Sequence, residues 1–271
     1  MTGGISAEVA AIEEYCAESA ERSIRLRLYR PIADAALRPA ILLLHGGGFV
    51  IGSLESHDEL CRALALRSRV IVVAVEYSLA PETPFPGALD DCRAALVWLD
   101  EGGVEIGIDP TRLAICGDSA GGNLAIATAL WAREQGILLR HVGLMYPALD
   151  PSCGSASAYE FGSGFILTRA FMQWFWEAYL GETGDPHDPR VAVMNADLAG
   201  LPPISLATAE YDPLRDEGEA FAQAARAAGV EVTARRYLGM IHGFATMPGT
   251  TPVAGRAIAD MAADIARSLT A

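Results

Sequence analysis

A serine, a histidine and a set of carboxylates occur in this chain in the order that acyl-transfer chemistry uses. Ser119 is the centre of the pentapeptide Gly117–Gly121, which reads G-x-S-x-G, and His242 lies far downstream in a glycine-flanked loop. Serine is a weak nucleophile, so it needs a base, usually histidine, that a carboxylate orients. We therefore expect Ser119 to be a nucleophile and His242 to be its general base.

The acid of this triad is expected just after the apolar run Ile204–Ala209, which has the composition of a buried strand. Glu210, Asp212, Asp216 and Glu217 all follow this run. Active sites of parallel sheets collect at the carboxyl ends of the strands, and Asp212 is the aspartate nearest to that end. Asp216 is better placed to cap the next helix and stays as the alternative. The sequence thus predicts Asp212 as the acid.

A glycine-rich loop, His45–Gly48, follows another apolar run, Ala40–Leu44. Consecutive glycines can turn bare backbone N–H groups towards a ligand, and acyl-transfer enzymes use such groups to stabilise an oxyanion. A further donor usually comes from the residue after the nucleophile, here Ala120. We expect an oxyanion hole formed by the N–H groups of Gly47, Gly48 and Ala120.

Other polar residues near these motifs are expected to be structural. His45 has the position to buttress the glycine loop by hydrogen bonding. Glu55, His57 and Asp58 precede a helical pattern and are expected to serve its N-terminus. None of the four is therefore predicted to react.

Apolar runs that alternate with helical patterns indicate the fold class. Unbroken runs are typical of strands that are covered on both faces, as in parallel sheets. Alternating strands and helices, with the motifs at strand ends, predict an α/β-hydrolase fold in a single domain, residues 1–271. The expected strands are 24–28, 40–44, 70–75, 113–116, 142–146, 204–209 and 231–237, and the expected helices lie near 55–68, 87–100, 120–135, 216–228 and 253–268.

One stretch breaks this alternation. Residues 151–200 contain a Gly/Ser-rich segment and then a strongly aromatic helical pattern, Thr168–Leu180. An insertion at this point of the chain would fold over the carboxyl ends of the strands as a lid. We therefore expect residues 151–200 to form a cap above the nucleophile.

The composition excludes several other kinds of function. A formal net charge of −14 argues against nucleic acid and membrane as partners. All 20 basic residues are arginine, so a Schiff-base lysine, a Ser–Lys dyad and a P-loop lysine are excluded. Five cysteines without paired spacing, and no export signal, predict reduced thiols and a cytoplasmic location. No metal or cofactor site is predicted, and the polar run 185–189 is expected to be an exposed turn.

Five segments carry a family resemblance: H-G-G-G-F at 45–49, Y-S-L-A-P-E at 77–82, G-D-S-A-G-G-N at 117–123, D-P-L-R-D-E-G at 212–218 and H-G-F at 242–244. Together they resemble the hormone-sensitive-lipase family of bacterial carboxylesterases. The resemblance implies hydrolysis of short-chain carboxylic esters by a serine hydrolase without metal or organic cofactor. It also implies the triad and the oxyanion donors that the residues themselves predict.

Two departures from the family pattern bear on the site. Ser78 stands where members commonly have arginine, at a position expected to be structural. Members also carry a longer N-terminal arm that forms half of the cap, and only 44 residues precede His45 here. That arm is expected to be largely missing, or reduced to a short helix near Ala7–Ala20. The pocket is then expected to be more open, with these apolar walls: Phe49, Phe165, Ile166, Phe171, Trp174, Trp176 and Met240.

Two other functions are compatible with the same residues. A ligand-binding protein on this scaffold is one, because a fold does not fix a function. A deacetylase, an amidase or a transacylase is the other, because these differ from an esterase in leaving-group protonation and pocket shape. The expected ligand is a small-molecule ester, and the reduced cap and apolar composition are compatible with a homodimer.

Overall fold

A computed structural model of the chain describes residues 8–18, 22–34, 36–247 and 249–270. Its centre is an eight-stranded sheet in the order β1-β2-β4-β3-β5-β6-β7-β8. β2 is antiparallel to both of its neighbours, whereas the strands from β4 to β8 pair in parallel, which confirms the expected mostly parallel sheet. The strands are β1 (Ala11–Glu18), β2 (Ser23–Arg30), β3 (Arg38–Leu44), β4 (Ile71–Val75), β5 (Ile108–Asp118), β6 (Leu139–Met145), β7 (Ile204–Tyr211) and β8 (Val232–Ile241).

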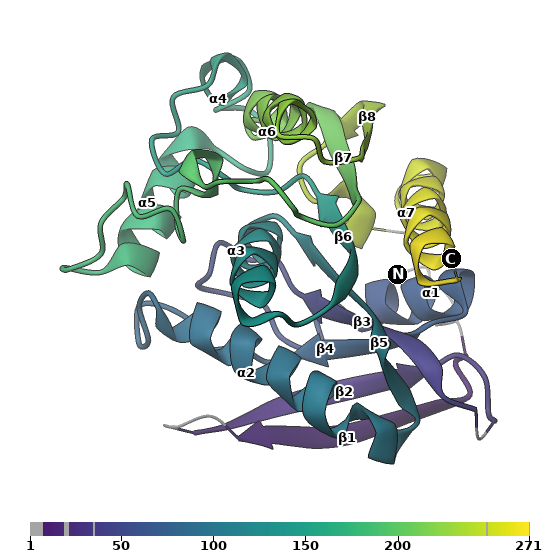
Figure 1. Ribbon diagram of the computed structural model, residues 1–271. Coiled ribbons are helices and arrows are strands. Elements are labelled where there is room, and N and C mark those ends of the chain that lie inside the picture. Colours follow the sequence, from purple (N-terminus) through teal and green to yellow (C-terminus); the bar gives the residue numbers. More distant parts are fainter. Residues whose placement is uncertain (1–7, 19–21, 35, 248, 271) are drawn as a thin grey trace.

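Helices cover both faces of this sheet (Figure 1). The helices α1 and α7 pack on one face, and α2, α3 and α6 contribute to the core on the other. The helices are α1 (Asp58–Ser68), α2 (Gly87–Gly102), α3 (Ala120–Gln135), α4 (Ala156–Glu160), α5 (Arg169–Leu180), α6 (Arg215–Ala227) and α7 (Pro252–Thr270), with short 3₁₀ helices at Gly103–Ile106, Val193–Asn195 and Phe244–Thr246.

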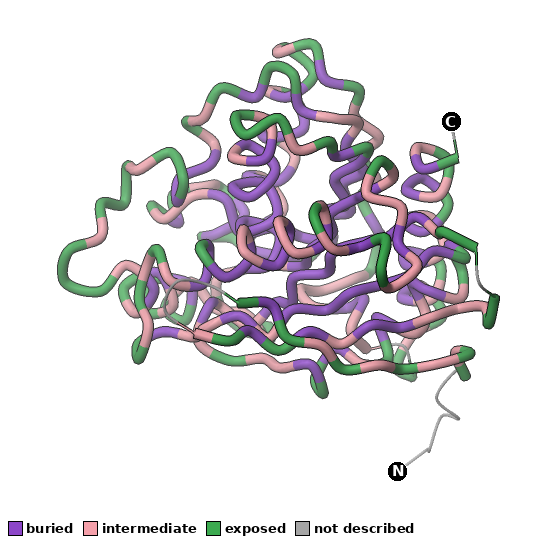
Figure 2. Tube along the Cα trace, turned by 60° about the horizontal axis from the view of Figure 1, so that its bottom comes forward, coloured by how far each residue is buried: buried purple, intermediate pink, exposed green. Residues whose placement is uncertain are grey.

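The parallel strands form because their sequences are unbroken apolar runs. Ile71–Val75 is buried along its whole length, and so is nearly all of Arg38–Leu44, as strands with helices on both faces must be. Figure 2 shows the buried parts of the chain running through the centre of the molecule and the exposed parts at its margin. Because these strands are parallel, their carboxyl ends share one edge of the sheet, where the loops with the predicted motifs begin.

The N-terminal segment is a strand, so the expectation of a short helix near Ala7–Ala20 is wrong. Residues 11–18 form β1, which pairs with β2 in antiparallel register. Glu14 lies opposite Arg27, 13 residues further along the chain, and the two side chains form an ion pair. Such cross-strand pairs stabilise the hairpin, and no local pattern of glutamates reveals them. Positions 7, 19 and 20 of the expected helix lie outside the described residues.

Residues 151–200 connect β6 to β7 and contain α4 and α5, which lie at one side of the molecule in Figure 1. The helix α5 begins one residue after Thr168, because the Thr168 hydroxyl accepts a hydrogen bond from the N–H of Phe171 and so caps the helix. The Asn123 side chain of α3 donates to the carbonyl oxygen of Val191 at 2.8 Å. This bond ties the returning part of the segment to the core.

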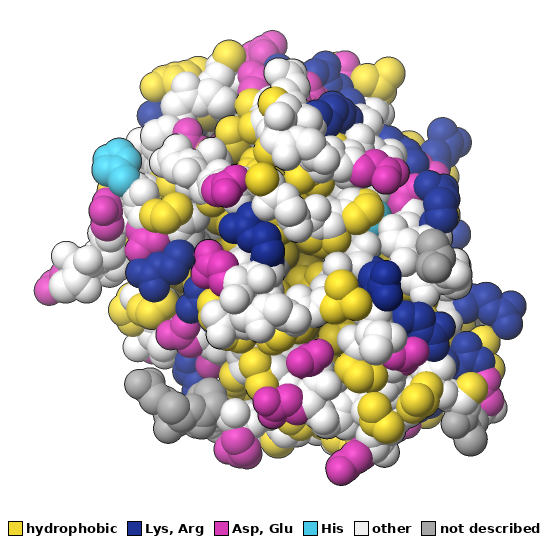
Figure 3. Space-filling view, in the orientation of Figure 1, with side chains coloured by type: hydrophobic (Ala, Val, Ile, Leu, Met, Phe, Trp, Pro, Cys, Tyr) yellow, Lys and Arg dark blue, Asp and Glu magenta, His cyan; other side chains and the backbone are white. Residues whose placement is uncertain are grey.

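Acidic and basic side chains are interspersed on the face shown in Figure 3, with hydrophobic side chains between them. Exposed large apolar side chains include Ile166, Phe171 and Trp174 of the 151–200 segment and Leu238 at the β8 edge of the sheet. Over the described ranges, no helix combines the length and the apolarity needed to cross a bilayer.

Candidate active site

Ser119 occupies a sharp turn between β5 and α3. Its backbone has φ 53° and ψ −120°, a conformation that residues with side chains rarely adopt. A Cβ built at Gly121 would overlap the carbonyl oxygen of Leu44, so the chain passes this turn only with glycine at that position. Because α3 begins at Ala120, Ser119 lies at the positive end of the helix dipole. The turn therefore presents a hydroxyl where negative charge is favoured.

Three side chains from separate loops meet at this turn. His242 Nε2 is 3.0 Å from Ser119 Oγ, and His242 Nδ1 is 2.9 Å from Asp212 Oδ2. Asp212 is fully buried, and its other oxygen accepts a hydrogen bond from the N–H of Leu214 at 2.9 Å. The ring of Tyr146 packs edge-on against the imidazole, with centroids 4.9 Å apart. The predicted serine, base and acid thus lie within hydrogen-bonding distance of one another.

Asp216, the alternative acid, has different partners. Its carboxylate accepts hydrogen bonds from the Arg215 guanidinium and from the N–H of Ser157, each at 2.8 Å. Burial of Asp216 opposes its ionisation, but these partners outweigh burial and lower the pKa of its carboxyl. Asp216 therefore joins α4 to α6, and the histidine is left to Asp212.

The glycine loop after β3 lies beside the serine. Gly47 and Gly48 have φ of 128° and 60°, and both line the cavity next to Ser119 together with Ala120. In the described part of the chain, neither N–H of these two glycines has a hydrogen-bond acceptor. Free N–H groups beside a nucleophile can receive the oxygen of a tetrahedral intermediate.

Phe175 covers this loop, although the sequence did not single it out. A Cβ built at Gly48 would overlap the ring of Phe175. The next residue, Phe49, stacks on Tyr179 with ring centroids 3.9 Å apart. Both partner rings belong to α5, so this helix packs directly on the glycine loop. The aromatic pattern of α5 was the available signal, but it does not tell which ring faces the loop.

Two histidines flank the loop in different ways. His45 stacks on Tyr77, with centroids 4.1 Å apart, and its Nδ1 is 2.8 Å from the carbonyl oxygen of Gly46. Burial lowers the pKa of His45 to about 4, so it is a neutral buttress, as expected. The His57 side chain does not cap α1, which corrects the expectation for it. Its Nε2 instead lies 3.1 Å from Oδ1 of Asp118.

A cavity of about 620 Å³ opens next to Ser119, with a mainly apolar wall. Phe165 is not part of that wall, because its ring stacks on Tyr211 with centroids 6.0 Å apart. Met240 is also absent from the wall and packs against the core cluster that α1 and α7 share. The other expected pocket residues do line the cavity: Phe49, Ile166, Phe171, Trp174 and Trp176.

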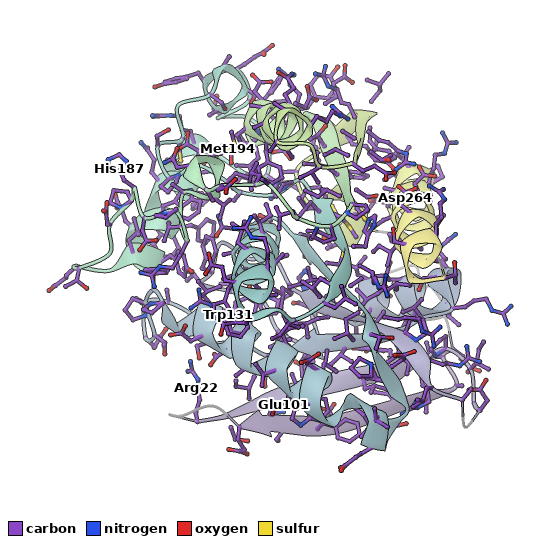
Figure 4. The ribbon with its side chains drawn as sticks, viewed as in Figure 1. Arg22, Glu101, Trp131, His187, Met194 and Asp264 are labelled. Carbon is purple, nitrogen blue, oxygen red and sulfur yellow. The ribbon has the colours of Figure 1, made fainter. Side chains whose placement is uncertain are left out.

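A second serine–histidine–aspartate group lies near the amino ends of β6 and β7, away from Ser119. Ser205 Oγ is 3.0 Å from His141 Nε2 and 3.0 Å from Asp264 Oδ2. The serine thus stands between the histidine and the carboxylate, the reverse of a triad, and Asp264 is also paired with Arg235. Figure 4 shows Asp264 on α7. This group joins β6, β7 and α7, and its geometry gives Ser205 no base that an acid orients.

Across the ranges that the structure describes, no three His, Cys, Asp or Glu side chains are grouped to hold a metal ion. All five cysteines are unpaired. Burial raises the pKa of the Cys116 thiol, close to Ser119 in the chain, so this thiol stays protonated in the core.

The fold and these contacts agree with a comparison to known families. Residues 41–246, which include Ser119, Asp212 and His242, match the family described as alpha/beta hydrolase fold. The chain therefore belongs to the α/β hydrolase family.

Two similar proteins are named as ester hydrolases. The chain is 42% identical over 233 residues to the carboxylic ester hydrolase LipN of Mycobacterium tuberculosis, covering 82% of this chain and 61% of LipN. It is 41% identical over 230 residues to the ethyl acetate hydrolase of Pseudomonas putida, covering 83% of this chain and 72% of that enzyme. This chain thus spans less than two thirds of LipN. The resemblance to bacterial carboxylesterases that the motifs predicted is confirmed.

Solved structures extend the likeness to nearly the whole chain. The hyperthermophilic esterase of the archaeon Pyrobaculum calidifontis superposes with a TM-score of 0.94 at 40% identity, over 97% of this chain and 88% of that one. The thermostable carboxylesterase EstE1, from a metagenomic library, gives a TM-score of 0.95 at 41% identity, over 98% and 91% of the two chains. The predicted fold class is confirmed by these superpositions.

Proposed function

We propose that this chain is a serine carboxylesterase that hydrolyses short-chain acyl esters through an acyl-enzyme intermediate. The observation that carries the proposal is the line of contacts from Ser119 through His242 to Asp212, at 3.0 and 2.9 Å, beside a loop with free N–H groups. The named relatives, which are ester hydrolases, support the same reaction class.

Each group in this proposal has one task. Ser119 Oγ attacks the ester carbonyl carbon while His242 Nε2 takes the hydroxyl proton. The N–H groups of Gly47, Gly48 and Ala120 hold the oxygen that becomes negative. Asp212 orients the imidazole and stabilises its charged form.

The second half of the reaction uses the same groups. His242 gives its proton to the alcohol as it leaves, and the acyl group stays on Ser119. The imidazole, again neutral, then takes a proton from a water molecule that attacks the acyl-enzyme. As the acyl–oxygen bond breaks, His242 returns this proton to Ser119 Oγ and the acid is released. Apart from the ester and the water molecule, each step uses groups of the chain itself.

The cavity wall supports a small, uncharged substrate. The side chains of α5 that reach the cavity are apolar, including Phe171, Trp174 and Trp176. A wall of this kind favours an apolar acyl or alcohol group by the area it removes from water. These α5 side chains give an ionised carboxylate or amine on the substrate no partner, so this side of the cavity disfavours such groups.

Substitution of the serine tests the proposal. Ser119→Ala removes the nucleophile, so turnover of p-nitrophenyl acetate and butyrate is expected to fall by a factor of about 10⁴ or more. Initial rates measured by release of nitrophenol at saturating substrate report this loss. Ser163→Ala, at an exposed serine of the same chain, serves as the control and should leave the rate unchanged. Full turnover by a folded Ser119→Ala protein would show that another group is the nucleophile.

We also propose the finer points of organisation. Residues 151–200 act as a cap of a single domain, because α5 lines the cavity and packs on the glycine loop.

A cytoplasmic location fits the five unpaired cysteines. A homodimer fits β8, an edge strand of the sheet with Leu238 exposed. Light scattering during size-exclusion chromatography tests the dimer, and fractionation of the producing cells tests the location.

A further inference from the structure

Asp118 anchors the glycine loop to the strand that carries the nucleophile. It directly precedes Ser119 and is 5% exposed. Its Oδ1 accepts a hydrogen bond from the N–H of Gly46 at 2.8 Å. A Cβ built at Gly46 would overlap the Asp118 carboxylate, so the two segments are in close contact. The position of Gly47 and Gly48, next in the loop, therefore depends on this carboxylate.

The hydrogen bonds around His57 determine its protonation. Ser56 Oγ donates its only proton to the carbonyl oxygen of Ser53 at 2.9 Å, so it can only accept from His57 Nδ1, 2.9 Å away. On the other side of the ring, His57 Nε2 faces Oδ1 of Asp118 at 3.1 Å, and a carboxylate can only accept. The N–H of Gly46 also points towards Nε2, at 3.3 Å, but makes its shorter bond, 2.8 Å, to Oδ1 of Asp118. Nε2 is thus assigned as a donor to the carboxylate and Nδ1 as a donor to Ser56, which makes His57 an imidazolium.

The electrostatics of the pair agree with this assignment. Burial of His57 disfavours its charge, but the Asp118 carboxylate outweighs burial and raises the pKa of the imidazole above its usual 6.5. Burial of Asp118 likewise opposes its ionisation, but His57 and the N–H of Gly46 lower the pKa of its carboxyl. The two groups thus form a buried ion pair next to Ser119.

Among the described residues, no titratable group other than His57 neutralises the negative charge of Asp118. Burial lowers the pKa of His45, whose ring centroid is 5.4 Å from that of His57, to about 4, so His45 is neutral. Asp58, on α1, binds Arg62 and the hydroxyl of Tyr29 instead, and Asp212 is engaged by His242. Burial raises the pKa values of the remaining titratable groups that sense Asp118 and keeps them neutral: Tyr77, Cys61, Cys116 and Tyr146.

An unpaired carboxylate at position 118 would oppose the reaction. The oxyanion is expected to form at the N–H groups of Gly47, Gly48 and Ala120, and Asp118 lies between the glycine loop and Ser119. Negative charge close to a developing anion raises the barrier, because such interactions are only weakly screened in a buried site. A cation at His57 cancels that charge.

We propose that His57, as an imidazolium paired with Asp118, is a positioning residue for the esterase reaction: it neutralises the carboxylate that anchors the oxyanion loop. This inference rests on the proposed function of Ser119. The His57–Asp118 pair has two tasks, since it fixes the start of the loop and keeps the surroundings of the oxyanion neutral. The consequence for pH is that kcat falls as the pH rises through the pKa of His57.

A pair of variants tests this proposal. His57→Gln leaves Asp118 without a cation, so kcat on p-nitrophenyl butyrate is expected to fall by a factor of about 10² with little change in KM. His57→Gln combined with Asp118→Asn replaces the ion pair by two neutral amides, which can still bond each other and the N–H of Gly46. This double variant is expected to recover at least tenfold of the lost kcat and to lose the fall at high pH. A merely structural role would leave the double variant no better than the single one.

His187→Gln is the matched control, because His187 is an exposed histidine on the segment after α5 (Figure 4). It should leave kcat and its pH profile unchanged. Three results would overturn the proposal: an unchanged kcat in His57→Gln, no recovery in the double variant, or a neutral His57 in the unmodified protein.

The last of these results needs neither a variant that folds nor an active enzyme. Nitrogen NMR of the histidine rings at neutral pH should show both nitrogens of His57 protonated, and this signal should titrate above the usual imidazole pKa of 6.5. The two proposals can fail separately. If NMR shows an imidazolium at His57 but the Ser119→Ala variant keeps its activity, only the proposed function of Ser119 is refuted.

Discussion

At the scale of single residues, the site depends on close approach between backbone segments. The turn at Ser119 has an unfavourable φ of 53°, and the glycine at position 121 lets the chain pass the carbonyl oxygen of Leu44. Such strain is retained where the surrounding structure fixes it, and here the sheet on one side and α3 on the other do so. The result is a serine hydroxyl that protrudes from the end of β5 towards His242.

Gly48 gives a prediction at this scale. Gly48→Ala would place a Cβ against the ring of Phe175 and add a side chain at φ 60°, so the loop must shift. Because loss of one oxyanion donor costs a factor of about 10²–10³, kcat on p-nitrophenyl acetate is expected to fall within that range. Gly102→Ala, where a Cβ meets nothing within 4 Å, is the control. Equal rates for the two variants would rule out Gly48 as a donor.

The meeting of Ser119, His242 and Asp212 could be predicted because these residue types occur in an order that is specific to acyl-transfer chemistry, while their catalytic roles and the oxyanion donors stay proposals. Asp212 was distinguished from Asp216 by its place nearest the strand end and by the expectation that Asp216 caps the next helix, and the contacts of both residues agree with that choice. His57 could not be assigned, because its partner Asp118 is 61 positions away in the sequence and the contact depends on how two loops fold together. Phe165 and Met240 were misplaced for the same reason, since composition does not tell which way an apolar side chain points.

At the scale of elements, α5 and the glycine loop form one packed unit. Phe49 stacks on Tyr179 at 3.9 Å and contacts Trp176 at 5.0 Å between ring centroids. Phe175 covers Gly48 in the same contact region. The segment that lines the substrate cavity thus also supports the loop that is proposed to hold the oxyanion.

Tyr179 is the residue with which to test this unit. It is fully buried, so Tyr179→Ala is expected to destabilise the protein by about 3–5 kcal/mol. Tyr179→Phe keeps the ring and its stacking on Phe49, so it should stay within about 1 kcal/mol of the unmodified protein. Urea denaturation followed by circular dichroism measures both. A loss of equal size in the two variants would mean that the hydroxyl, rather than the stacked ring, stabilises α5.

Helices and strands could be predicted from the sequence where a local pattern of residues determines them. The helix expected at 120–135 is α3 with the same bounds, and the strand expected at 40–44 lies within β3. The strand expected at 24–28 lies within β2, but its partner β1 was missed because the stability of that pair comes from contacts between strands, such as Glu14 with Arg27. A run with several glutamates has no local feature that distinguishes an edge strand of this kind from a helix.

At the scale of the whole molecule, the parallel part of the sheet brings distant residues together. Ser119 follows β5, Asp212 follows β7 and His242 follows β8, and all three strands end at one edge of the sheet. The second serine–histidine group, around Ser205, lies near the amino ends of its strands instead. The topology therefore places the group around Ser119, which fits acyl transfer, at the opposite ends of the strands from the group around Ser205, which stabilises the fold.

The most direct test of this account is the site of covalent labelling by a fluorophosphonate. Mass spectrometry of the intact protein after labelling should show the addition of one phosphonyl group, and peptide mapping should place it on Ser119. The adduct mimics the tetrahedral intermediate, so it forms only where a nucleophile, its base and an oxyanion hole meet. Absence of an adduct, or an adduct on Ser205 or any other residue, would contradict the assignment of Ser119 as the nucleophile.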